Sequence, residues 1–189
     1  MKRTELTLSG LCIIETETHN DARGFFMETY HREKFASLGI TKAFVQDNHS
    51  RSVQGVVRGL NFQFDEPADK LIRVLQGSIF AVGVDMRPSS RTFGKWAAVE
   101  LSSDNRKTMY LPFGFAFGFC ALSETADVLY KLSAVHNEHG SGTIRWNDPD
   151  IGISWPSIAR LVSPGDAQAP SFKKWIASGG STAIERASQ

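Results

Sequence analysis

Short runs of apolar residues, separated by polar turn residues, recur along most of the chain. These runs are rich in Val, Ile, Leu and Phe, and they cover residues 6–14, 44–46, 56–64, 71–75, 79–86, 96–101, 108–111, 115–122 and 128–132. Gly, Pro, Ser, Asn and Asp gather between the runs, as at residues 76–77, 87–90 and 102–105. Many short strands at this spacing predict an all-β fold, either a sandwich or a barrel.

Outside the predicted strands, the pattern indicates one helix and a loose end. Residues 31–38 have a helical pattern that Gly39 ends. Apolar periodicity is lost after Trp155 and Pro156, and residues 179–181 read Gly-Gly-Ser. We therefore expect one domain over residues 1–170 and a loosely held C-terminal tail over residues 171–189.

The first predicted strand, residues 6–14, is long for a strand at the edge of a sheet. In that position it would leave backbone N–H and C=O groups unpaired unless it joined a neighbouring strand. This predicts a homodimer.

Composition narrows the class of protein. The 189 residues are 41% hydrophobic and 22% charged, as in ordinary globular domains. A formal net charge of +1 gives no strong attraction to nucleic acid or a membrane surface. The start MKRTELTLSG lacks the apolar run of a secretory signal. No segment approaches the ~18 apolar residues of a membrane span. We therefore expect a cytoplasmic protein. Cys12 and Cys120 are expected to be buried free thiols.

Several motifs occur in a fixed order over about residues 5–170. They are DARGFFMETY, FVQDNHSRS, GVVRGLNFQ, KLIRVLQGSIFAVGVDMR, TFGKWAAVELS, LPFGFAFGF, LSETADVLYK, RWNDPDIGISWP and SPGD. In this order and spacing, the set resembles the dTDP-4-dehydrorhamnose 3,5-epimerase family. The resemblance implies a cupin-type jelly-roll β-barrel with few short helices. It also implies action on a nucleotide-linked 4-keto-6-deoxysugar, with no metal or cofactor, in a homodimer that exchanges an N-terminal strand.

The resemblance also implies roles for individual residues. Those expected at the nucleotide end, partly across a dimer, are Arg23, Phe26 and Glu28. Those expected to line the binding site or face the diphosphate and sugar are Gln46, Asp47, Asn48, Arg58, Asn61, Lys70 and Phe117. Tyr130 would be the proton donor, and Asp166 would orient the base. These residue types suit the reaction, because a proton beside a ketone is moved by a base and an acid while cations stabilise the enolate.

One local feature follows from combining the resemblance with strand geometry. Period-two alternation puts Arg58 and Asn61 on opposite faces of the strand. The family uses both positions in its site, so we expect a twist or bulge near Gly59.

The chain departs from the family pattern at the reacting end. Asn61 replaces the catalytic histidine of RGLHYQ, and Phe62 replaces the tyrosine beside it. Phe117 stands for the histidine of FAHGF, Gly165 for the lysine of SxKD, and Ser141 for a glutamate. An amide cannot take a proton from carbon at neutral pH. The pattern predicts an intact nucleotide site joined to a rebuilt or inactive sugar site.

Metal binding is not expected. Asn61 and Gln63 occupy the positions where many cupins carry a His-x-His pair, and amides are poor transition-metal ligands. His136 and His139 form the only close histidine pair, and their polar loop VHNEHGSG is expected to be solvated.

Three functions stay open at this point. The first is an epimerase or related isomerase with a substitute base, for which His49 and Asp166 are the candidates. The second is a non-catalytic nucleotide-sugar binder with a regulatory or scaffolding role. The third is a cupin with an unrelated small ligand. We favour the first, because a resemblance over nearly the whole chain usually carries the reaction class.

Overall fold

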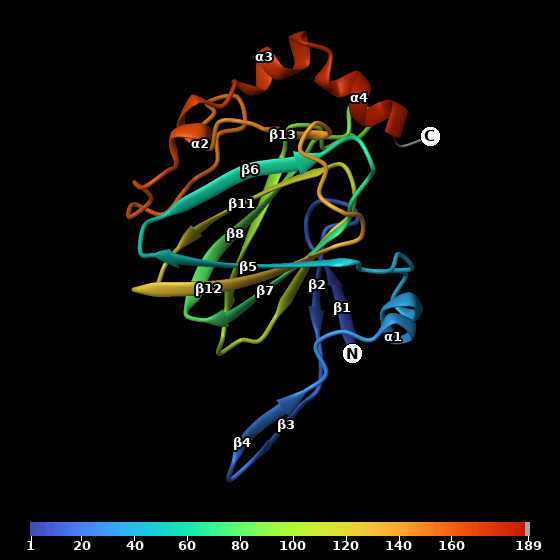
Figure 1. Cartoon of the computed structure of the whole chain (residues 1–189), viewed down its shortest axis with the longest axis vertical. Helices are drawn as coiled ribbons and strands as arrows, with labels where there is room; N and C mark the ends of the chain where they lie inside the picture. Colours follow the sequence, from blue (N-terminus) through green and yellow to red (C-terminus); the bar gives the residue numbers. More distant parts are fainter. Residues whose placement is uncertain (188–189) are drawn as a thin grey trace.

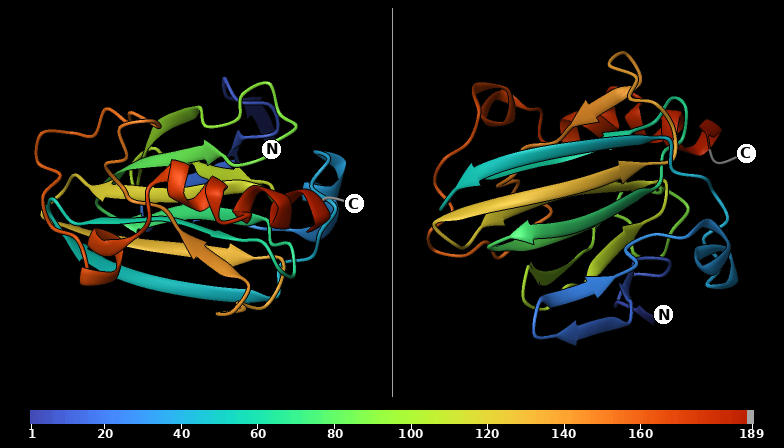
Figure 2. Two further views of the ribbon diagram at one scale, coloured as in Figure 1. Left: turned by 90° about the horizontal axis from the view of Figure 1, so that it is seen from above. Right: turned by 60° about the horizontal axis from the view of Figure 1, so that its bottom comes forward.

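The computed structural model describes residues 1–187, and within them two antiparallel sheets face each other (Figures 1 and 2). The strands of the six-stranded sheet are, in spatial order, β1 (Lys2–Glu5), β2 (Cys12–Glu15), β10 (Thr108–Leu111), β7 (Lys70–Gln76), β12 (Thr125–Leu132) and β5 (Gln46–Val53). Those of the five-stranded sheet are β13 (Ser141–Thr143), β6 (Val57–Gln63), β11 (Phe115–Ala121), β8 (Ser78–Asp85) and β9 (Trp96–Ser102). The prediction of an all-β fold is confirmed.

The main core lies between these sheets. Ile72 and Met109 from the six-stranded sheet pack with Ile79, Leu101 and Phe115 from the five-stranded sheet. All of these side chains are buried, as the alternation of apolar and polar positions in half-buried strands requires.

The prediction for residues 6–14 is wrong. The segment does not form one long strand, because the chain turns between β1 and β2. Leu6 N donates to Leu11 O at 2.9 Å, and Gly10 takes a φ of +92° that glycine adopts without strain. β2 lies inside the sheet between β1 and β10, so the long unpaired edge from which we predicted a homodimer does not exist.

The first helix is confirmed, whereas the loose tail is not. Helix α1 (Arg32–Ser37) ends just before Gly39, whose N–H donates to Ala36 O at 2.9 Å. The C-terminal segment contains α2 (Pro164–Gln168), α3 (Phe172–Ala177) and α4 (Gly180–Ala187). Phe172, Trp175 and Ile184 are buried in a second apolar cluster on the outer face of the five-stranded sheet, which the helices cover in Figure 2.

The expectation is wrong because the turn residues of this segment begin and separate helices and do not mark a loose chain. Ser171 caps α3 by accepting a hydrogen bond from Lys174 N at 3.2 Å, and Gly179 only separates α3 from α4. Phe172, Trp175 and Ile176 have helical spacing that buries one face. The domain therefore continues past residue 170. Residues 188–189 of the expected tail lie outside the described residues.

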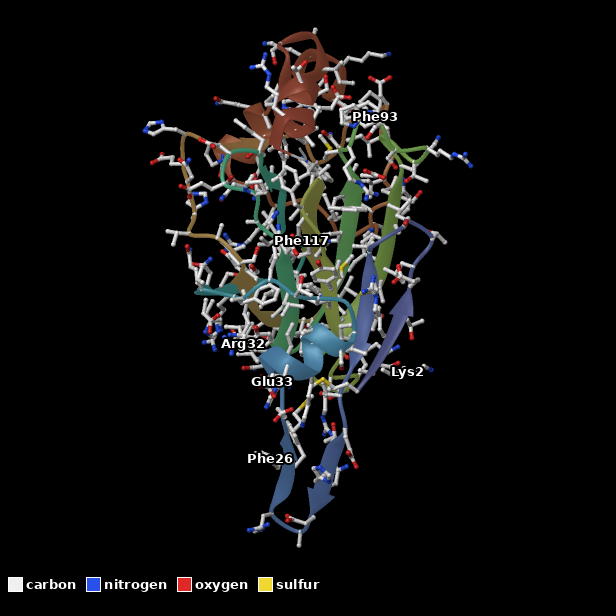
Figure 3. The ribbon with its side chains drawn as sticks, turned by 90° about the vertical axis from the view of Figure 1, so that its right-hand side faces the viewer. Lys2, Phe26, Arg32, Glu33, Phe93 and Phe117 are labelled. Atoms are coloured by element: carbon white, nitrogen blue, oxygen red, sulfur yellow. The ribbon has the colours of Figure 1, made fainter. Side chains whose placement is uncertain are left out.

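A hairpin projects from the body. It consists of β3 (Thr18–Asp21) and β4 (Gly24–Met27), and Figures 1 and 3 show it extending away from the two sheets. Phe25 and Phe26, near its end, are 52% and 71% exposed. No helix within residues 1–187 is long and apolar enough to cross a membrane.

Candidate active site

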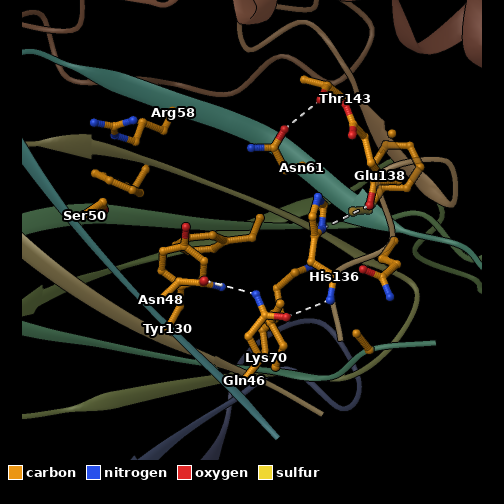
Figure 4. A pocket seen from close by; sticks show the side chains of 18 residues that line it. Gln46, Asn48, Ser50, Arg58, Asn61, Lys70, Tyr130, His136, Glu138 and Thr143 are labelled. Carbon is orange, nitrogen blue, oxygen red and sulfur yellow. Dashed lines mark hydrogen bonds between the residues drawn. The ribbon is translucent and has the colours of Figure 1, made fainter. Parts of the chain in front are cut away.

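A pocket of about 560 Å³ opens between the two sheets, in the size range of small-molecule sites. Six strands (β5, β6, β7, β11, β12 and β13) and the loop between β12 and β13 build most of its wall. The polar residues that line it are Gln46, Asn48, Ser50, Arg58, Asn61, Gln63, Lys70, Tyr130, His136, Glu138, Ser141 and Thr143. Figure 4 shows these side chains converging from both sheets.

An irregularity in β6 brings Arg58 and Asn61 to the same pocket. Asn61 pairs with Phe117 of β11, and Arg58 pairs with Phe119, so the register shifts between these two pairs. Gly59 has a φ of +102°, and a Cβ there would collide with the Phe117 carbonyl. The predicted bulge near Gly59 is confirmed, and it depends on glycine.

Strand β5 divides its side chains between the pocket and the solvent. Gln46 and Asn48 face the pocket, and Gln46 Nε2 donates to Asn48 Oδ1 at 3.1 Å. Asp47 faces out and accepts from Lys131 Nζ at 2.7 Å. His49 also lies outside, with its Nε2 3.6 Å from Asp127 Oδ1. The structure thus does not place Asp47 in the pocket, and His49 cannot serve there as a base.

Asp166 also lies outside the pocket. It is in the first turn of α2, where its backbone N–H donates to Ser163 Oγ at 3.1 Å and its carboxylate accepts from the same hydroxyl at 3.0 Å. The sequence Ser-Pro-Gly-Asp is therefore used as a helix cap. The amide of Asn61 pairs instead with Thr143, whose Oγ1 donates to Asn61 Oδ1 at 2.7 Å.

Arg58 and Lys70 supply positive charge. Arg58 is held by hydrogen bonds from Nε to Ser52 Oγ at 3.0 Å and from a terminal nitrogen to Arg51 O at 3.2 Å. Lys70 lies in the pocket wall, where burial lowers its pKa to about 8. The neighbouring Asp69 carboxylate opposes this shift, but burial is the larger effect.

The expected nucleotide-end residues do not reach the pocket of their own chain. Arg23 pairs with Asp21 at the tip of the hairpin, and Glu28 pairs with Lys34 Nζ at 2.8 Å. Phe26 lies on the projecting hairpin, as labelled in Figure 3, and does not line the pocket between the sheets. Phe26 and Glu28 instead line a second hollow, beside helix α1.

Several lining residues lie in β13 and in the loop before it, where the sequence had not led us to expect a binding site. The segment after Tyr130 returns over the pocket, and β13 pairs with β6 so that Thr143 lies opposite Asn61. His136, expected to be solvated, lines the pocket, and its backbone N–H donates to Gln46 Oε1 at 2.7 Å. The only signal in the sequence was a histidine pair a few residues after the motif LSETADVLYK. His139 does not line this pocket.

The pocket can bind an anion and move protons. Arg58 and Lys70 suit a diphosphate or an enolate oxygen. Tyr130, from β12, offers a hydroxyl, and His136 offers an imidazole. No group of three or more His, Cys, Asp or Glu side chains within residues 1–187 could hold a metal ion.

Comparison with known proteins agrees with this arrangement. A model of the dTDP-4-dehydrorhamnose 3,5-epimerase family matches residues 5–174. A protein of that name from Methanothermobacter thermautotrophicus is 51% identical over 151 residues, which cover 79% of this chain and 81% of the relative.

Solved structures extend the similarity to the fold. RmlC from Legionella pneumophila in complex with dTDP-4-keto-L-rhamnose is 40% identical with a TM-score of 0.88, over 91% of this chain and 93% of that chain. A double mutant of ChmJ, a 3'-monoepimerase from Streptomyces bikiniensis, in complex with dTDP is 27% identical with a TM-score of 0.89, over 97% and 95%. The predicted cupin-type jelly roll is confirmed, and the chain belongs to the dTDP-4-dehydrorhamnose 3,5-epimerase family.

Proposed function

We propose that this protein binds a dTDP-linked 4-keto-6-deoxyhexose and epimerises it at C3, at C5 or at both, in deoxysugar biosynthesis. The observation that carries the proposal is the convergence of Arg58, Lys70 and Tyr130 in one pocket of a chain that belongs to this family. Arginine binds phosphate oxygens through a two-point fork, and a lysine beside the ketone oxygen stabilises the enolate.

The related structures support a dTDP sugar as the ligand. The RmlC of Legionella pneumophila was solved with dTDP-4-keto-L-rhamnose. The ChmJ mutant, in which a histidine is replaced by asparagine and a tyrosine by phenylalanine, was solved with dTDP. A chain of this fold therefore holds the nucleotide after such a replacement, which is relevant to a chain that carries Asn61.

The test is solvent exchange during turnover. The protein is incubated in D₂O with a dTDP-4-keto-6-deoxyhexose, and deuterium at C3 and C5 is followed by NMR and mass spectrometry. We expect incorporation at one or both carbons and no incorporation without protein. Binding of dTDP, measured by calorimetry, tests the nucleotide site separately from the reaction.

A non-catalytic nucleotide-sugar binder is the second candidate function. It is favoured by one observation, the hydrogen bond that holds the Asn61 amide at the position of the family base. Tight binding of the nucleotide sugar without exchange at either carbon would favour this function over the epimerase.

We further propose a homodimer in which the β3–β4 hairpin completes the pocket of the partner copy. Phe26 is 71% exposed, and Arg23 lies in the turn of the hairpin and does not line the pocket of its own chain. Sedimentation should give about twice the chain mass of 20.9 kDa, and a species at 20.9 kDa at micromolar concentration would contradict the dimer. Strand exchange and a cytoplasmic location stay predictions.

A further inference from the structure

The pocket needs a proton acceptor other than Asn61. Asn61 Oδ1 accepts the hydrogen bond from Thr143 Oγ1 at 2.7 Å, which leaves the Nδ2 group to face the pocket. In Figure 4 this nitrogen points away from Thr143 and into the open space. An amide N–H₂ donates hydrogen bonds and does not accept a proton from carbon. The strand position therefore supplies a donor to a substrate oxygen, and the base lies elsewhere.

Few lining side chains can take a proton. They are His136, Glu138 and Lys70. Lys70 suits a different task, because with a pKa of about 8 most of its population is charged at neutral pH and can stabilise an enolate. His49 and His139 do not line the pocket. His136 and Glu138 remain as acceptors.

The surroundings of His136 orient its ring. Its backbone N–H is tied to Gln46 Oε1 at 2.7 Å, and Gln46 is tied in turn to Asn48. Its Nδ1 lies 3.5 Å from Ser141 Oγ. The Ser141 hydroxyl already donates its single proton to Asn137 O at 2.7 Å, so toward the ring it can only accept.

This arrangement favours one tautomer of the ring. If Ser141 Oγ accepts, Nδ1 carries the ring proton, and the lone pair is on Nε2. In Figure 4 the ring extends from the loop toward Asn61, between Lys70 and Glu138. Nε2 is thus the ring nitrogen left for a ligand in the pocket that His136 and Asn61 both line.

We propose that His136 Nε2 takes the proton from the carbon beside the keto group; this inference rests on the epimerisation proposed above. The C–H bond breaks, its proton binds Nε2, and its electron pair forms the C=C bond of an enolate whose charge lies on the C4 oxygen beside Lys70. The Tyr130 hydroxyl then gives its proton to the same carbon from the other face. The phenolate and the imidazolium return to their starting states by exchange with water.

The test compares His136→Ala with His139→Ala in the deuterium assay. His139 is in the same loop and exposed, but it lies outside the pocket. We expect His136→Ala to lower the exchange rate by about 10²–10⁴-fold, as loss of a general base does, and His139→Ala to keep the wild-type rate. Free imidazole should restore part of the lost rate, because the side chain of His136 is exposed at the pocket mouth and the small base can enter.

Binding of dTDP serves as the folding control, with His136→Gln as a second variant if His136→Ala does not fold. Loss of exchange without rescue by imidazole would assign His136 a structural role and overturn the inference. An unchanged rate in His136→Ala, with loss in Glu138→Gln, would overturn it in favour of the carboxylate. Absence of exchange in the wild type would instead overturn the proposed function itself, so the two failures are distinguishable.

Discussion

Thr143 Oγ1 donates a hydrogen bond to Asn61 Oδ1 at 2.7 Å, across the pairing of β13 with β6. The two residues come from segments that are distant in sequence, and their pairing fixes which way the amide faces. Since the oxygen is occupied, the Asn61 N–H₂ group is presented to the ligand. The position where the resemblance led us to expect a base thereby becomes a fixed hydrogen-bond donor.

Thr143→Val removes the hydroxyl while keeping the shape of the side chain. The Asn61 amide can then turn its oxygen toward the ligand, and one hydrogen bond of about 1 kcal/mol is lost. We expect the affinity for the full nucleotide sugar to fall about 5-fold and the affinity for dTDP alone to stay unchanged, both measured by calorimetry. Thr41→Val, at an exposed position outside the pocket, is the matched control. Equal loss with dTDP would contradict an amide directed at the sugar.

Asn61→His alone should restore little activity of the family type. Asp166 is engaged in capping α2, so it cannot orient the new imidazole, and Phe117 is the β11 residue paired with this position. Catalytic groups that act as a unit are not additive, and we expect the exchange rate to rise by less than about tenfold. The deuterium assay on both proteins measures this. A much larger rise would show that a histidine at this position works without its carboxylate.

Arg58→Ala should weaken dTDP binding. Loss of a charge-assisted fork costs about 1.5–3 kcal/mol, which corresponds to about 10–150-fold in the dissociation constant. Calorimetry with dTDP measures this loss, with Arg91→Ala as the control. Arg91 is exposed and does not line the pocket, so the Arg91→Ala variant should bind dTDP as the wild type does. If Arg58→Ala also binds like the wild type, Arg58 does not contact the phosphates.

The strands could be predicted from the sequence because each is a short run bounded by turn residues. β5 alternates buried and exposed positions, whereas β11 is buried on both faces and reads as a continuous apolar run. The bulge at Gly59 could be predicted only from two requirements together, the alternation and a shared site for Arg58 and Asn61. The turn within residues 6–14 was missed because Leu8 and Leu11 continue an apolar pattern through it, and both are buried in the core.

The site was predictable where strand residues form it and not where a loop does. Gln46, Asn48, Lys70 and Tyr130 come from strands and lie in the pocket. His136 comes from a loop whose path depends on tertiary contacts, above all the hydrogen bond to Gln46. Asp166 matched a family motif, but the local cap with Ser163 decides where its carboxylate lies.

Trp175→Ala should destabilise the whole domain. The Trp175 ring packs against Phe62 with a centroid distance of 5.2 Å and stacks on Phe172 at 6.2 Å. Truncating a buried aromatic side chain costs about 3–5 kcal/mol. The free energy of unfolding, from urea titration followed by circular dichroism, measures the loss. Lys174→Ala, on the exposed side of α3, should change it by less than about 0.5 kcal/mol. A small effect of Trp175→Ala would mean that α3 is peripheral to stability.

The charge on Lys70 should make nucleotide binding depend on pH. Burial lowers the pKa of Lys70 from its ordinary value of 10.5 to about 8 in the ligand-free protein. The ammonium is therefore present below this pH and is lost above it. A negatively charged ligand in the same pocket favours the charged form even without direct contact, so dTDP should bind more weakly as the pH rises from about 7 to about 9. Lys70→Met should bind weakly at both pH values and lose this dependence. Lys95→Met, an exposed lysine outside the pocket, should keep it. Calorimetry at the two pH values measures the affinity for dTDP in each variant. If the pH dependence persists in Lys70→Met, the titrating group is not Lys70.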